Sequence, residues 1–130
     1  MDSKMSLAVQ SVIDLHVVIE DVFTGRNQGE SLPLLLNSFA PDFKMVTIQG
    51  QGITHNDVTA LFSQLVGKKP HLTIAIQNIV PIQQVGSDCW IQYQELQTNE
   101  GISSLRISTA CIHVENEKCT WKYLHETPVK

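Results

Sequence analysis

The second half of the chain consists almost entirely of strand-forming segments joined by short turns. Four such segments follow one another, at about residues 71–85, 88–98, 102–115 and 119–127. They are rich in β-branched and aromatic residues or alternate apolar with polar positions, and the junctions between them contain Gly or Asn. Junctions of this composition are typical of hairpins. The pattern therefore predicts a sheet of long, mostly antiparallel strands.

One irregularity interrupts the first of these segments. Leu72, Ile74 and Ile76 alternate with polar or small residues, but Ile79 falls out of phase and Pro81 follows it. Proline cannot donate a hydrogen bond to a sheet ladder, and a phase break of this kind is typical of a β-bulge. We therefore expect a bulge or bend here. Long strands with such a bulge curl, and helices could cover the concave side.

The first half of the chain predicts three helices, at about residues 7–23, 31–40 and 54–66, because apolar residues recur there at helical spacing. Gly25 and Gly67 are natural stops for the first and third helices. Thr54 is a suitable N-cap for the third helix, and Asp57 stands three residues later, where a carboxylate favours the positive end of the helix dipole.

The second predicted helix is short and leads into a strand. It begins at Ser31, with Pro33 in its first turn, where the missing N–H has no cost. Its buried side is expected to contain Leu34, Leu35 and Phe39. Pro41 ends it, because the residue before a proline disfavours the helical conformation.

A strand at residues 43–49 and a turn at residues 50–52 then complete the first half. The expected element order is α-α-β-β-α-β-β-β-β, in a single domain over residues 1–130. We find no internal repeat and no low-complexity segment.

Composition narrows the function class without naming a function. Nine Lys and Arg residues against thirteen Asp and Glu give a net charge of −4, which argues against a nucleic-acid partner. No apolar stretch approaches the length of a membrane helix, and the N-terminus does not resemble a signal peptide. The three cysteines and five histidines show no metal-ligand spacing. We therefore expect a soluble, cytoplasmic protein with no nucleic-acid or membrane partner, no dedicated metal site and no cofactor.

The paired strands bring polar side chains together on one face of the sheet. If residues 88–98 and 102–115 are joined by a two-residue turn at residues 100 and 101, Glu95 lies directly opposite Arg106 and Tyr93 lies opposite Ser108. Opposite charges favour this register, since a slip of one residue would move Glu95 to the other face.

The last hairpin is expected to add more polar groups to the same face. A two-residue turn at residues 116 and 117 places His125 beside Ser108 and Tyr123 on the same face, whereas one extra loop residue would bring Glu126 in place of His125. If this face is concave, the group lines the mouth of a pocket suited to a small polar or anionic ligand. The predicted ligand-binding set is Tyr93, Glu95, Arg106, Ser108, Tyr123 and His125. The alternative is that Glu95 and Arg106 form only a stabilising salt bridge at the rim.

Three local segments carry a resemblance to a known family. These are Phe39 to Phe43 leading into a strand, the turn-to-helix passage from Gly50 to Asp57, and the closing segment from Trp121 to Thr127. With the element order, they resemble the nuclear transport factor 2-like superfamily, which includes ketosteroid isomerase and SnoaL-like cyclases, over about residues 7–127. The resemblance implies a cystatin-like α+β cone, in which a curved, mostly antiparallel sheet wraps around a pocket roofed by helices.

The chain departs from the isomerase pattern, which has a carboxylate on the first strand and a tyrosine in the first helix. Residues 43–49 contain no Asp or Glu, and residues 6–24 contain no Tyr. Carbanion chemistry of the isomerase type is therefore not expected. Because the first helix borders the pocket in this fold, the resemblance makes His16 a candidate general base beside His125. A histidine on an apolar helical face can equally be a hydrogen-bonded core residue.

The opposite face of the predicted sheet mixes aromatic, aliphatic and amide side chains. The residues that characterise it are Trp90, Gln92, Gln94, Ile107 and Thr109. Such a surface suits a homodimer interface, and the resemblance also implies dimers through the outer sheet face. Two hypotheses remain open: a small-ligand-binding cone, which could be a hydrolase, dehydratase or isomerase using a His base and Arg106, and a non-catalytic dimerisation or protein-interaction module.

Overall fold

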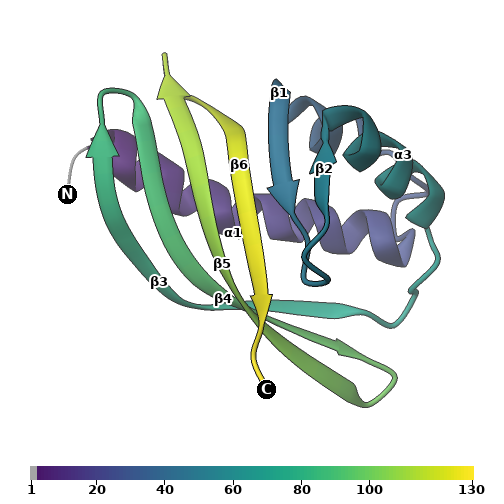
Figure 1. Cartoon of the computed structure of the whole chain (residues 1–130). Coiled ribbons are helices and arrows are strands. Elements are labelled where there is room, and N and C mark those ends of the chain that lie inside the picture. The colour runs from purple at the N-terminus through teal and green to yellow at the C-terminus, as the bar shows by residue number, and fades with distance from the viewer. Residues whose placement is uncertain (1–2) are drawn as a thin grey trace.

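The computed structural model describes residues 3–130 and shows a curved six-stranded sheet with helices on its concave side (Figure 1). The elements are α1 (Ser3–Thr24), α2 (Leu32–Asn37), β1 (Phe39–Val46), β2 (Gly52–Thr54), α3 (His55–Leu65), β3 (Thr73–Val85), β4 (Asp88–Asn99), β5 (Ile102–Glu115) and β6 (Lys118–Pro128). This is the predicted order, and the predicted α+β cone is confirmed. No helix within these residues is long and apolar enough to cross a membrane.

The strands lie in the order β2-β1-β6-β5-β4-β3. All neighbours are antiparallel except β1 and β6, which pair in parallel and bring an early strand beside the last one. The expected description of the sheet as mostly antiparallel is therefore correct.

The predicted bulge in β3 is present. The register between β3 and β4 shifts after Gln77 and again after Pro81, and Asn78 has a φ of 51°. A bulge adds residues to one strand only, so that strand bends and its local twist increases. In Figure 1, β3 and β4 bend strongly and carry the sheet around α1.

The long helix α1 packs along the concave face. It ends at Gly25, which has a φ of 69°, a conformation that glycine adopts readily. A Cβ atom at Gly25 would lie 2.9 Å from the Cα of Gly67, just beyond α3, so this close approach requires glycine. The backbone N–H of Gly67 also donates to the carbonyl of Val22 at 2.9 Å. The ends of α1 and α3 are thereby held together.

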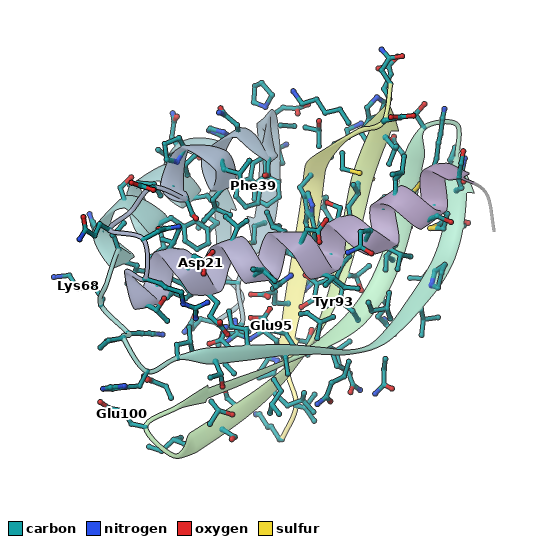
Figure 2. The ribbon with its side chains drawn as sticks, turned by 180° about the vertical axis from the view of Figure 1, so that it is seen from behind. Asp21, Phe39, Lys68, Tyr93, Glu95 and Glu100 are labelled. Atoms are coloured by element: carbon teal, nitrogen blue, oxygen red, sulfur yellow. The ribbon has the colours of Figure 1, made fainter. Side chains whose placement is uncertain are left out.

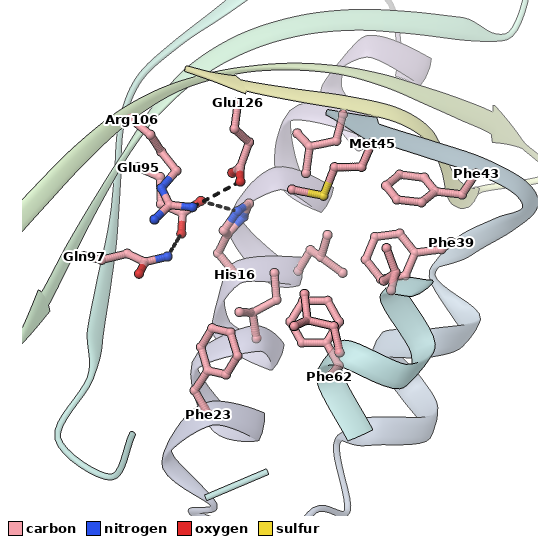
Figure 3. A pocket seen from close by; sticks show the side chains of 15 residues that line it. His16, Phe23, Phe39, Phe43, Met45, Phe62, Glu95, Gln97, Arg106 and Glu126 are labelled. Atoms are coloured by element: carbon pink, nitrogen blue, oxygen red, sulfur yellow. Dashed lines mark hydrogen bonds and ion pairs between the residues drawn. The ribbon is translucent and has the colours of Figure 1, made fainter. Parts of the chain in front are cut away.

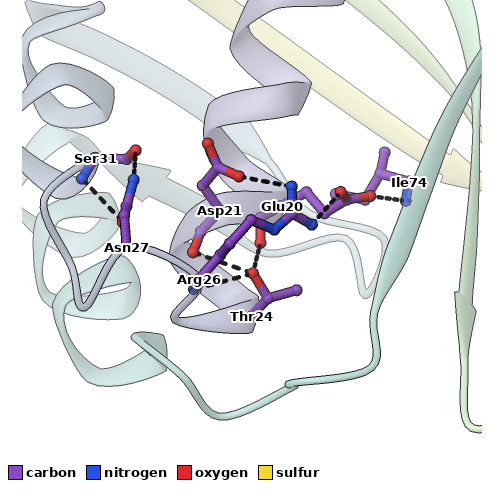
Figure 4. A network of polar contacts seen from close by, with 7 residues as sticks. All are labelled: Glu20, Asp21, Thr24, Arg26, Asn27, Ser31 and Ile74. Atoms are coloured by element: carbon purple, nitrogen blue, oxygen red, sulfur yellow. Dashed lines mark hydrogen bonds and ion pairs between the residues drawn. The ribbon is translucent and has the colours of Figure 1, made fainter.

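A polar network ties the same end of α1 to the sheet (Figure 4). Glu20 Oε1 accepts a hydrogen bond from the backbone N–H of Ile74, at the start of β3, at 2.7 Å. Arg26 donates to Glu20 Oε2 at 2.9 Å and lies 3.1 Å from Asp21 Oδ1. The Glu20–Ile74 contact ties the helix that carries His16 to β3, and Arg26 adds an exposed ion pair to it.

The prediction for the second helix is partly wrong. Helix α2 covers only Leu32–Asn37, and Phe39 is the first residue of β1, where it pairs with Trp121 of β6. Leu35 is fully buried, but Leu34 is 60% exposed. Pro41 lies inside β1 and not at the end of a helix; the register between β1 and β6 shifts between Phe39 and Lys44, an irregularity at which a strand can accept proline.

Candidate functional site

A cavity of about 120 Å³ lies between α1, α3, β1 and the inner face of β4, β5 and β6. Most of its wall is apolar and includes Phe23, Phe39, Phe43 and Phe62. Its polar side chains are His16, Glu95, Gln97, Arg106 and Glu126. Figure 3 shows these polar side chains gathered at one end and the phenylalanines toward the other. The cavity is therefore amphiphilic.

The predicted register of β4 and β5 is correct. Glu95 is the Cα partner of Arg106, and Tyr93 is the partner of Ser108. All four lie on the inner face of the sheet, and Figure 2 shows Tyr93 and Glu95 beneath α1. Glu95 and Arg106 line the cavity, whereas Tyr93 and Ser108 are fully buried beside it.

The predicted register of the last hairpin is wrong. Its turn has two residues as expected, since Glu115 pairs with Lys118, but β6 then contains one extra residue, Lys122. Beyond this point Glu126 is the partner of Ser108, and His125 is the partner of Thr109 on the outer face. The open alternative, Glu126 in place of His125, is what the structure shows, although the extra residue lies in the strand and not in the loop.

Tyr123 and His125 consequently lie outside the cavity. Their side chains contact each other on the outer face, with Tyr123 Oη 3.3 Å from His125 Nδ1. The sequence contains a signal for this bulge. Trp121 and Leu124 are both large apolar residues three positions apart, and strict alternation cannot bury both on one face.

His16 does face the cavity, where both of its ring nitrogens have partners. Nδ1 donates to the carbonyl oxygen of Val12 at 2.7 Å, and Nε2 lies 3.1 Å from Glu95 Oε1, with both side chains 4% exposed. The hydroxyl of Tyr93 is 3.4 Å from the same Nε2. Burial by itself would lower the pKa of His16, but the hydrogen bond and the charge of Glu95 raise it. This arrangement favours an imidazolium that donates from both nitrogens.

Glu95 is held in its ionised form by the same contacts. Burial opposes the charge, but His16 and a 2.6 Å hydrogen bond from Gln97 together leave the pKa of Glu95 below its ordinary value. Its cross-strand partner Arg106 forms its ion pair elsewhere. The Arg106 guanidinium lies 3.1 Å from Glu126 Oε1, on the next strand.

Glu126 differs from Glu95 in its balance of interactions. Burial and the nearby charge of Glu95 raise the pKa of Glu126, in spite of Arg106. The hydroxyl of Ser108 donates to Glu126 Oε2 at 3.3 Å. The sequence prediction missed Gln97 as a cavity residue and included Glu126 only as the alternative to His125.

The outer face contains the five residues predicted for an interface. Trp90, Gln94, Ile107 and Thr109 are half-buried and Gln92 is exposed. The ring of Trp90 lies 6.1 Å from that of Tyr123, and Asn78 donates to the Gln94 side chain at 2.8 Å. The face is thus partly apolar and internally hydrogen-bonded.

No protein-family model and no curated protein matches the chain. Among solved structures, a nuclear transport factor 2-like protein of unknown function from Pseudomonas aeruginosa aligns over 95% of this chain and 99% of its own, with a TM-score of 0.91 and 28% identity. A candidate dehydratase of the same family from Streptomyces avermitilis has a TM-score of 0.72 and 11% identity over 96% and 98% of the two chains. A calcium/calmodulin-dependent kinase II hub from S. rosetta has a TM-score of 0.68 and 8% identity, over 92% and 95%.

The last two likenesses, at low identity, concern the fold alone. The Pseudomonas protein matches nearly end to end, at higher identity and with a closer superposition. Together with the shared element order and the curved sheet around α1, this match defines the family. The chain is a member of the nuclear transport factor 2-like superfamily.

Proposed function

We propose that this protein binds a small polar or anionic organic ligand in the cavity under α1. The observation that carries the proposal is an apolar cavity with a guanidinium, two carboxylates and an imidazole gathered at one end. Ligand sites in proteins are typically apolar clefts with a few convergent polar groups. Of the predicted ligand-binding set, Glu95 and Arg106 line this cavity. Tyr93 and Ser108 are buried beside it, and Glu126 takes the position predicted for His125.

The size of the cavity limits the ligand. An apolar cavity of about 150 Å³ holds benzene in another protein, and the cavity here measures about 120 Å³. A single ring or a short branched chain fits such a volume, whereas a fused-ring steroid does not. The carboxylate of β1, Asp42, is exposed and does not line the cavity, and together with the size of the cavity this supports binding without isomerase-type catalysis.

The alternative is a small hydrolase, dehydratase or isomerase with His16 as base and Arg106 as the anion-stabilising group. The contact between His16 and Glu95 is the observation that favours it, and one structural neighbour is a candidate dehydratase. Because both ring nitrogens of His16 carry protons in this arrangement, His16 would have to release its Nε2 proton before it could accept one from a substrate. Turnover of a bound ligand, followed by NMR, distinguishes this alternative from binding alone.

Thermal-shift screening with small organic acids, alcohols and amides tests the proposal. Arg106→Met removes the cationic end of the cavity, and Arg26→Met is the matched control because Arg26 is the other arginine of the chain and its side chain is 58% exposed. We expect a ligand that raises the melting temperature of the wild type and of Arg26→Met but not of Arg106→Met. Absence of any stabilising compound in a broad screen would refute the proposal.

We also propose that the chain forms a homodimer through the outer sheet face around Trp90, Ile107 and Thr109. A half-buried mixture of aromatic, aliphatic and amide groups suits a subunit interface, and one structural neighbour is a kinase hub domain. Sedimentation tests the dimer. Ile107→Lys should give a monomer, while Lys118→Glu, at the exposed first residue of β6, should leave the dimer intact. A wild type of 14.5 kDa at micromolar concentration would contradict the proposal.

A further inference from the structure

Arg106 has unused hydrogen-bonding capacity at the polar end of the cavity. A guanidinium carries five N–H donors in a rigid fork. Only Nη1 has a hydrogen-bond partner among residues 3–130, which is Oε1 of Glu126 at 3.1 Å. The side chain lines the cavity and is 16% exposed. Its remaining donors are therefore available to a ligand, and the fork matches a carboxylate in a two-point contact.

The two carboxylates at this end are not equivalent. Glu95 has an imidazolium and an amide as donors, whereas Glu126 has Arg106 and the weaker hydroxyl contact of Ser108. The titratable groups that face Glu126 are His16 from α1, Glu95 and Tyr93 from β4, and Arg106 from β5. Burial and the charge of Glu95 already raise the pKa of Glu126. Glu126 is therefore the carboxylate that accepts a proton at the lower cost.

Charge balance limits what can enter. With His16 and Arg106 positive and both glutamates negative, the polar end is neutral, and an added anion would leave one uncompensated charge in a mostly buried space. Such a charge is costly unless it is paired or neutralised. Protonation of Glu126 restores neutrality and at the same time frees Nη1 of Arg106.

We propose that the ligand is a small monocarboxylic acid whose carboxylate replaces Glu126 on Arg106, while Glu126 takes up one proton from solvent. This inference rests on the proposed function. No covalent bond changes; one Arg106–carboxylate contact is exchanged for another. The phenylalanine-lined end of the cavity receives the apolar body of the acid, so the class comprises aromatic acids with one ring and short branched aliphatic acids.

Calorimetric titration with benzoate, phenylacetate and isovalerate tests the proposal, with benzamide and benzyl alcohol as neutral probes of similar size. In buffers of different ionisation enthalpy, binding of the acids should take up close to one proton per ligand. The affinity should fall by up to about tenfold per pH unit above the pKa of Glu126 in the free protein, because the complex binds the extra proton. The neutral probes should show no proton uptake.

Two variants locate the proton. Glu126→Gln should bind the acids without proton uptake and without the pH dependence, since its amide cannot titrate. Ser108→Ala removes a neighbouring contact of Glu126 and leaves the carboxylate, so it should retain the proton uptake. Circular dichroism and urea unfolding confirm that each variant is folded, and the proton uptake of the wild type tests the proposal without any variant.

The results separate this inference from the proposed function. Acids that bind with no proton uptake and no pH dependence would overturn the inference, as would neutral probes that bind while the acids do not; in both cases the ligand pocket itself would stand. Proton uptake that persists in Glu126→Gln would also overturn it. If neither the acids nor the neutral probes bind, the ligand pocket and the inference both fail.

Discussion

Two histidine–carboxylate pairs connect β4 to its surroundings, one on each face of the sheet. On the inner face, His16 of α1 lies 3.1 Å from Glu95, and each side chain is 4% exposed. On the outer face, His113 of β5 lies 2.8 Å from Asp88, with side chains 35% and 31% exposed. The shorter contact belongs to the partly exposed pair, so distance alone is a poor guide to which pair contributes more to stability.

The two pairs shift pKa values in the same directions for different reasons. Each raises the pKa of its histidine and lowers that of its acid. For His113 the hydrogen bonds to Asp88 and Glu115 are the largest contributions, whereas for His16 burial is the largest and the pair must overcome it. Removing one member of the inner pair therefore leaves a buried charge without its partner. Removing one member of the outer pair leaves a charge that solvent can hydrate.

The largest expected effect comes from removing one member of the inner pair. His16→Leu leaves the Glu95 carboxylate buried, with Gln97 as its one remaining side-chain hydrogen-bond donor among residues 3–130. We expect the free energy of unfolding to fall by about 3–5 kcal/mol, as for other broken buried ion pairs. Urea unfolding followed by circular dichroism measures the change.

The double variant His16→Leu/Glu95→Met is the control for this experiment. It removes both charges and fills the space with apolar atoms, so it should recover most of the lost stability. Equal losses in the single and double variants would show that packing of the imidazole, and not charge pairing, is what His16 contributes.

The next effect is a pH dependence with two limits. The pKa of His16 is raised above its ordinary 6.5, so its stabilisation is fully present below about pH 6.5 and is lost as the pH rises through the folded-state value. The pKa of Glu95 is lowered below 4.5, so its stabilisation is present above that value and is lost as the pH falls through the folded-state value. The difference in unfolding free energy between the wild type and the double variant should therefore be largest between these limits.

Each unit of pKa shift corresponds to about 1.4 kcal/mol, which sets the scale of the expected change. Urea unfolding of both proteins from acidic to alkaline pH measures it. A difference that stays constant across this range would show that neither His16 nor Glu95 titrates differently on folding.

Much of the fold could be predicted because its signals are local. Gly25 ends α1, Asp57 accepts the backbone N–H of Thr54 at the start of α3, and the phase break before Pro81 marks a real bulge. The sequence predicts Leu34 on the buried side of a helix and Phe39 within that helix, but Leu34 is exposed and Phe39 begins β1. Periodicity cannot distinguish a short helix from the strand that follows it.

The site was only partly predictable because its geometry depends on distant parts of the chain. Cross-strand register placed Glu95 opposite Arg106, since hairpin pairing follows from turn length. The bulge at Lys122 arises from burying both Trp121 and Leu124, and it exchanged His125 for Glu126. The choice of Glu126 as partner of Arg106 could not be read from the sequence, because it depends on how β6 packs on β5.

A smaller effect is expected for the outer pair. His113→Gln removes the contact with Asp88, but both side chains are about one-third exposed and Lys122 remains 3.4 Å from Asp88 Oδ2. The loss of unfolding free energy should be below about 1 kcal/mol, as for other exposed pairs. His71→Gln, at an exposed position before β3, is the control for replacing a histidine. A loss as large as that of His16→Leu would contradict the assignment of the difference to burial.

The smallest effect is the response of the two pairs to salt, and it tests the cause of the difference most directly. At about 1 M salt the Debye length is about 3 Å, so charges in contact with solvent are screened, while buried charges are screened much less. Double-mutant cycles with His113→Gln and Asp88→Asn, and with His16→Leu and Glu95→Met, give the coupling energy of each pair. The outer coupling should disappear at high salt, whereas the inner coupling should keep most of its value. If both couplings fell together, water would have to reach the inner pair, and the cavity under α1 would be more open than its buried glutamates imply.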